Sequence, residues 1–79
     1  MKATDFEIIE MVGQCGERVA YASGKHEVLE LNLVRYQSKL TAYDLRWWTE
    51  ENRQPREGIF LTEKSLASLG ELIDEAFKK

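Results

Sequence analysis

The residues best suited to binding chemistry lie in the middle of the chain, where arginine and aromatic side chains share two short segments. The first segment, YDLRWW at residues 43–48, places Arg46 just before two tryptophans. The second, PREGIFLT at residues 55–62, carries Arg56 and then Phe60. Flat rings stack on unpaired bases and guanidinium groups track phosphates, so these residue types favour a flat, anionic ligand such as single-stranded nucleic acid.

Alternating side chains predict four strands followed by one helix, an α+β fold with an antiparallel sheet. The strands are expected at 6–12, 27–36, 40–48 and 59–61, and residues 18–22 either extend the first strand or form another. Gly13 and Gly16 are expected to mark a bend or bulge, and 49–57 a charged loop. Thr62 has the side chain of a helix N-cap, and the helix is expected to follow it.

Side chains of a strand alternate between two faces, so the same pattern assigns residues to faces of the sheet. The first face is apolar, and we expect the helix to cover it, with Trp47 in the core. The second face is left open, either to bind a ligand or to bury aromatic side chains between subunits. The apolar face comprises Leu29, Leu31, Leu33, Tyr43, Leu45, Ile59 and Leu61. The open face carries Asn32, Tyr36, Arg46, Trp48 and Phe60, with Lys39, Arg53 and Arg56 on nearby loops.

The expected helix has an apolar stripe wide enough to contact both its own sheet and a second helix. A chain of 79 residues forms one domain, 1–79, and a domain this short is marginally stable alone. We therefore expect a homodimer. The expected dimer contacts are Leu69, Leu72, Ile73 and Phe77.

Composition excludes several classes of protein. No apolar run is long enough to span a membrane, and the N-terminus is not that of a signal peptide. We therefore expect a cytoplasmic, nucleoid-associated protein in which Cys15 is a reduced thiol. His26 has no second ligand type placed for a metal site, and no acid–base or cofactor-binding pattern indicates an enzyme. The net charge of −3 opposes nucleic-acid binding, but the acidic residues gather near the ends and residues 18–56 are mildly basic.

Three segments together resemble the positive cofactor four family of transcriptional coactivators, most closely its small bacterial members. They are LNLVRY at 31–36, YDLRWW at 43–48 and PREGIFLT at 55–62. The resemblance covers residues 31–73 well and 6–13 loosely. It implies a curved four-stranded sheet, a C-terminal helix and a two-fold homodimer that binds single-stranded DNA on concave sheet faces.

The resemblance also assigns roles to individual residues. Arg46 matches an arginine that meets phosphate, Tyr36 a stacking tryptophan of bacterial members, and Trp48 an aromatic position beside that arginine. Arg56 matches one basic residue of the loop before the fourth strand. The chain departs from the family at three positions, and residues 14–24 look longer than in bacterial relatives. The departures are Glu57 in place of lysine, Phe60 in place of a small hydroxyl residue, and Thr49 in place of the tryptophan of eukaryotic members.

The sequence therefore predicts a non-enzymatic protein that binds single-stranded DNA with little sequence preference. Two alternatives remain. The first is a protein-interaction module that keeps the fold without binding nucleic acid, which the net charge and Glu57 favour. The second is RNA binding on the same face, because stacking alone does not distinguish the two sugars.

Overall fold

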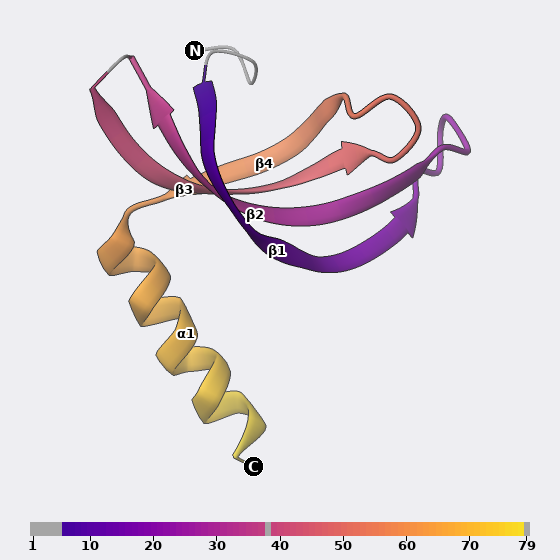
Figure 1. The fold of residues 1–79 in the computed structure, drawn as a ribbon. Helices are drawn as coiled ribbons and strands as arrows, with labels where there is room; N and C mark the ends of the chain where they lie inside the picture. Colours follow the sequence, from indigo (N-terminus) through magenta and orange to yellow (C-terminus); the bar gives the residue numbers. More distant parts are fainter. Residues whose placement is uncertain (1–5, 38, 79) are drawn as a thin grey trace.

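The computed structural model of this chain describes residues 6–37 and 39–78. The strands are β1 (Phe6–Val19), β2 (His26–Tyr36), β3 (Leu40–Thr49) and β4 (Pro55–Leu61), and the helix α1 spans Glu63–Phe77. The strands form one antiparallel sheet in the order β1-β2-β3-β4, and α1 follows it (Figure 1). This is the α+β fold that the alternation of side chains predicted.

Both edge strands are longer than the sequence predicted. β1 continues past Gly13 and Gly16 because register shifts at three points let it bend without losing its pairing with β2; the expected bulge is confirmed. β4 begins at Pro55, the first residue of an edge strand, where the missing N–H costs no ladder hydrogen bond. The expected charged loop is therefore only a short turn. It is closed by Thr49, whose Oγ1 accepts a hydrogen bond from the Gln54 amide at 2.7 Å.

The sheet is strongly curved, and one of its faces is concave (Figure 1). Phe6 on β1 and Phe60 on β4 belong to opposite edges, yet their ring centroids lie 5.7 Å apart. The sheet therefore closes over the face that these rings share, which we call the concave face. Its other main residues are Glu30, Asn32, Tyr36, Asp44, Arg46 and Trp48. We call the opposite side the leucine face; it comprises Leu29, Leu31, Leu33, Tyr43, Leu45, Trp47, Ile59 and Leu61.

The position of α1 corrects one prediction. The helix begins as expected, since the Thr62 hydroxyl accepts a hydrogen bond from the Ser65 amide at 3.0 Å. It then extends away from the sheet instead of covering the leucine face (Figure 1), and it contacts only β3 and β4. Within α1, only Leu66 and Leu69 are half-buried. The leucine face, including Trp47, is consequently half-buried or exposed rather than enclosed in a core.

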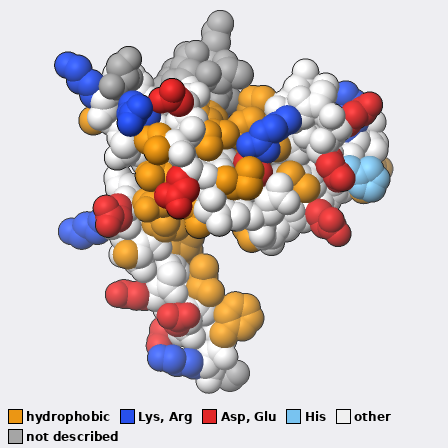
Figure 2. Space-filling view, viewed as in Figure 1, with side chains coloured by type: hydrophobic (Ala, Val, Ile, Leu, Met, Phe, Trp, Pro, Cys, Tyr) orange, Lys and Arg blue, Asp and Glu red, His pale blue; other side chains and the backbone are white. Residues whose placement is uncertain are grey.

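Apolar side chains are accordingly displayed on the outside of the molecule. Figure 2 shows hydrophobic groups running from the sheet onto α1, with acidic and basic groups around them. Leu72, Ile73 and Phe77 are all exposed on the helix, and Phe77 is 86% exposed. A surface of this kind is usually covered by a partner.

Among the glycines of the chain, Gly58 has the closest neighbouring atoms to the position of an added Cβ atom. It lies on β4 opposite Arg46, a residue of the concave face. A Cβ atom built there would lie 2.7 Å from both the Arg46 Cβ and the Leu45 carbonyl oxygen. We expect Gly58→Ala to lower the free energy of unfolding by about 1–3 kcal/mol, because the backbone oxygen cannot move aside. Gly70→Ala is the control, since nothing lies within 4 Å of its Cβ position. Within α1 it should instead stabilise the helix by about 1 kcal/mol. Urea denaturation of the two variants measures both effects, and equal shifts would contradict the close approach at Gly58.

Candidate nucleic-acid interface

Three aromatic rings form a cluster at one end of the concave face. Tyr36 and Phe60 are stacked, with ring centroids 5.4 Å apart and an interplanar angle of 16°. Phe6 meets Phe60 edge-on and also approaches Trp48 at 6.3 Å. Phe6, Tyr36 and Phe60 are each half-buried, so parts of their rings remain open to a ligand.

The Arg46 guanidinium lies beside this aromatic cluster, but its hydrogen bonds are directed into the protein. Its Nε donates to both Asp44 carboxylate oxygens, at 3.1 and 3.2 Å, and its Nη2 donates to Asp44 Oδ2 at 2.9 Å. Its Nη1 donates to the Arg56 carbonyl oxygen at 2.7 Å. The residue is only 7% exposed. Arg46 therefore ties β3 to the start of β4 and offers little of its charge to solvent.

A second ionic cluster lies beside Trp48 and centres on Glu30, a fully buried carboxylate. Arg53, from the turn between β3 and β4, donates to it twice, through Nη1 at 3.1 Å and Nη2 at 2.7 Å. Gln14 and Asn32 donate one hydrogen bond each. The concave face thus holds a polar network where the sequence had suggested an open row of cations.

The two buried carboxylates titrate in opposite directions. Burial on its own raises the pKa of Glu30, but the hydrogen bonds from Arg53, Asn32 and Gln14, with the charge of Arg53, bring it below its ordinary value. Burial raises the pKa of Asp44 above its ordinary value, because Arg46 compensates only in part for the lost hydration and the charge of Glu30 adds to the rise. The protein therefore stabilises the charged form of Glu30 more than that of Asp44.

A third ionic cluster sits at the far end of the leucine face. Arg18 donates to Glu27 and to Glu57, each at 2.7 Å, and its guanidinium lies 4.1 Å from the Trp47 ring centroid. The Arg56 Nε lies 3.3 Å from the other oxygen of Glu27. Hydrogen bonds from its own backbone amide and from Arg18 lower the pKa of Glu57. The acidic residue at the position where the resemblance expects lysine thus has an arginine partner on β1.

The structure brings some of the predicted site residues together and separates others. Tyr36, Phe60, Arg46, Trp48 and Arg53 converge on the concave face. Trp48 differs from the expected exposed platform, since it is only 6% exposed. Lys39 is exposed in the turn between β2 and β3, and Arg56 pairs with Glu27 toward the leucine face.

The site residues predicted from the sequence did not include Phe6, Glu30 or Asp44, although Asp44 and Glu30 were considered as partners of Arg46. Phe6 joins the aromatic cluster because β1 pairs it with Tyr36, and that register is not readable from one strand alone. The signal for the carboxylates was present: each alternates onto the same face as Arg46. With the pairs that Glu7 and Glu27 form, the pairs of Glu30 and Asp44 place every arginine of the chain in an ion pair.

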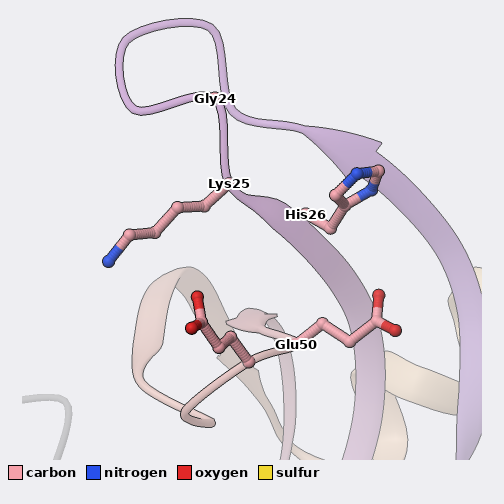
Figure 3. A pocket seen from close by; sticks show the side chains of 5 residues that line it. Gly24, Lys25, His26 and Glu50 are labelled. Carbon is pink, nitrogen blue, oxygen red and sulfur yellow. The ribbon is translucent and has the colours of Figure 1, made fainter.

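Hollows also lie outside the aromatic cluster, and one of about 400 Å³ is lined by Arg18, Glu27, Arg56 and Glu57 of the third ionic cluster. Another hollow, of about 430 Å³, is lined by Gly24, Lys25, His26, Glu50 and Glu51. Figure 3 shows Lys25 and Glu50 extending in opposite directions. Within residues 6–37 and 39–78, α1 is too short and too polar to cross a membrane.

Comparison of the chain with protein-family models gave no match, and comparison with curated proteins gave none either.

Proposed function

We propose that this chain binds single-stranded DNA on the concave face, in the manner of the positive cofactor four family. The observation that carries the proposal is the stacked pair Tyr36–Phe60, half-buried beside the Arg46 guanidinium, which lies 5.8 Å from the Phe60 ring centroid. Bases stacked on such rings contribute about 1–3 kcal/mol each without regard to sequence. No catalytic role is part of the proposal.

The ionic part of binding proceeds by exchange. Each arginine is already paired with a carboxylate, so a phosphate must displace that carboxylate to gain the contact. Arg53, on the concave face, and Arg56, toward the leucine face, are the candidates for exchange, since their side chains are 46% and 47% exposed. Lys39 supplies an exposed cation at the end that carries Tyr36. Exchange makes the net electrostatic gain small, which agrees with a net charge of −3.

The proposal includes a homodimer. The leucine face and the helix residues Leu72, Ile73 and Phe77 expose apolar side chains that one copy of the chain does not cover among its described residues. A second copy would cover this surface and set two concave faces side by side. The aromatic residues of the concave face would then bind one strand from two protomers.

Titration with single-stranded DNA, duplex DNA and RNA oligonucleotides of equal length tests the proposed function. We expect single-stranded DNA to bind more tightly than duplex DNA, because duplex bases are not free to stack. Tyr36→Ala should weaken single-strand binding by about 1–3 kcal/mol, and the slope of log K against log salt should stay nearly constant since no phosphate contact is lost. Tyr21→Ala is the matched control, because Tyr21 is fully exposed in the turn between β1 and β2.

One outcome would favour the protein-interaction module instead. If the wild-type chain binds none of the three oligonucleotides and Tyr36→Ala only destabilises the fold, the aromatic cluster is structural. The pairing of every arginine with a carboxylate and the exposed apolar stripe of α1 are the observations that favour this second candidate. Equal affinity for RNA and single-stranded DNA would extend the ligand class to both.

A further inference from the structure

Trp48 is an aromatic ring of the concave face that a side chain covers from the solvent side. The guanidinium of Arg53 lies 4.6 Å from the Trp48 ring centroid, and Trp48 is 6% exposed. The indole Nε1 is buried and donates to no acceptor among the described residues. A buried donor without a partner is costly, so a movement that brings an acceptor to Nε1 would be favourable.

Glu30 holds Arg53 in this position through two hydrogen bonds, at 3.1 and 2.7 Å. The same carboxylate accepts hydrogen bonds from Gln14 at 3.1 Å and from Asn32 at 2.8 Å. If Arg53 left, each Glu30 oxygen would keep one amide donor. The carboxylate is therefore built to remain buried without the arginine, which is unlike Asp44, whose hydrogen bonds among the described residues all come from Arg46.

Arg53 is also free to move. It belongs to the turn between β3 and β4, outside both strands, and its backbone has a φ of 51°, in the left-handed region that side chains other than glycine adopt at a cost. Its side chain is 46% exposed. An exposed arginine on a strained turn can leave its partner with little disturbance to the sheet.

We propose that Arg53 is a gate over Trp48. In the free protein Glu30 holds the gate closed, and the guanidinium occupies the ring face on which a base would stack. A single strand opens it by giving Arg53 a phosphate in place of Glu30 and giving Trp48 a base in place of the guanidinium. A bare polyanion offers only the first of these exchanges, so the gate selects ligands that carry both a phosphate and a free base. This inference rests on the proposed function and names the nucleotide subsite within it.

The closed state is tested first without any ligand, in a Trp47→Phe background so that Trp48 is the fluorophore. Phenylalanine keeps an aromatic ring beneath Arg18, which stacks on Trp47. Arg53→Ala should raise the acrylamide quenching constant of Trp48 severalfold, because the ring loses its cover. Arg35→Ala is the matched control: Arg35 is 47% exposed and also pairs with a glutamate, Glu7. If the quenching constant of Trp48 is unchanged in Arg53→Ala, the gate is overturned, even if the protein binds oligonucleotides.

The opening step is tested by titrating oligodeoxythymidine into Arg53→Lys and the control Arg35→Lys. Lysine keeps the charge for phosphate but loses the flat, bidentate geometry that holds the gate closed. Arg53→Lys should bind about fivefold more tightly, because the strand no longer has to break the Arg53–Glu30 ion pair, which is worth about that factor. The salt slope should stay unchanged.

The outcomes separate the gate from the proposed function. Binding by Arg53→Lys that is equal to or weaker than that of the wild type overturns the gate while the proposed function stands. If Arg53→Ala exposes Trp48 but neither the wild type nor Arg53→Lys binds the oligonucleotide, the proposed function fails and Arg53 is only a structural cover.

Discussion

Asp44→Ala is expected to lower the free energy of unfolding by about 3–5 kcal/mol, because it leaves the buried Arg46 guanidinium without its carboxylate. Asp44 is fully buried and supplies the acceptors for three of the hydrogen bonds of Arg46. The Arg56 carbonyl oxygen would be the one protein acceptor left to Arg46 among those found in the described residues. Urea denaturation followed by circular dichroism measures the loss.

The matched control removes a carboxylate of the same kind from the surface. Glu7 pairs with Arg35, and both side chains are largely exposed, so Glu7→Ala should cost less than about 1 kcal/mol. If the two alanine variants are equally stable, Arg46 has found solvent or another acceptor, and the concave face is more open than its burial indicates. A large loss at Asp44 would identify the Arg46–Asp44 pair as part of the scaffold beneath the site.

This has a consequence for how Arg46 is tested as a phosphate ligand. The resemblance assigns phosphate contact to Arg46, but a variant at that position also removes the tie between β3 and the start of β4. Lost affinity in Arg46→Ala would then report lost folding as well as lost contact. Arg53, which is half-exposed and leaves Glu30 with two other donors, is the cleaner probe of the ionic part of binding.

Much of the fold could be predicted because strand periodicity is a local property. The alternation in residues 27–36 and 40–48 assigned Leu31 and Leu45 to one face and Asn32 and Arg46 to the other, and the cross-strand register agrees. Thr62 marked the start of the helix for an equally local reason, the side-chain acceptor that caps its first turn. Each of these inferences needed only neighbouring residues.

The remaining features depended on contacts between distant parts of the chain. Alternation tells which residues share a face but not whether that face is packed, so the burial of Glu30 and Asp44 was not foreseen. The reach of Arg18 from β1 to Glu57 on β4 depends on how the sheet twists. The apolar stripe of α1 also did not predict the direction of the helix after Thr62. Such a stripe can pack against the sheet of its own chain or against that of another copy.

The exposed stripe of α1 leads to the prediction with the largest effect on assembly. Leu72, Ile73 and Phe77 are exposed on α1, and this helix projects from the sheet (Figure 1). Association that covers large exposed apolar side chains is favourable. It stabilises the assembly by about 25 cal/mol per Å² of apolar surface removed from water. Half-buried leucines on the sheet add to the same surface. A second copy of the chain is therefore the partner that we expect to cover it.

Ile73→Glu should convert the protein from a dimer to a monomer, because a charge placed at the centre of the stripe would lose its hydration in the interface. Light scattering at micromolar concentration should give about twice 9.2 kDa for the wild type and about 9.2 kDa for the variant. Ala67→Glu is the control, since position 67 is exposed on the charged side of α1 and should leave the dimer intact. The melting temperature of the wild type should rise with protein concentration, as mass action requires for a dimer, and that of Ile73→Glu should not. A wild-type monomer, or an Ile73→Glu dimer as stable as that of Ala67→Glu, would contradict the assembly and remove the paired concave faces from the proposed binding mode.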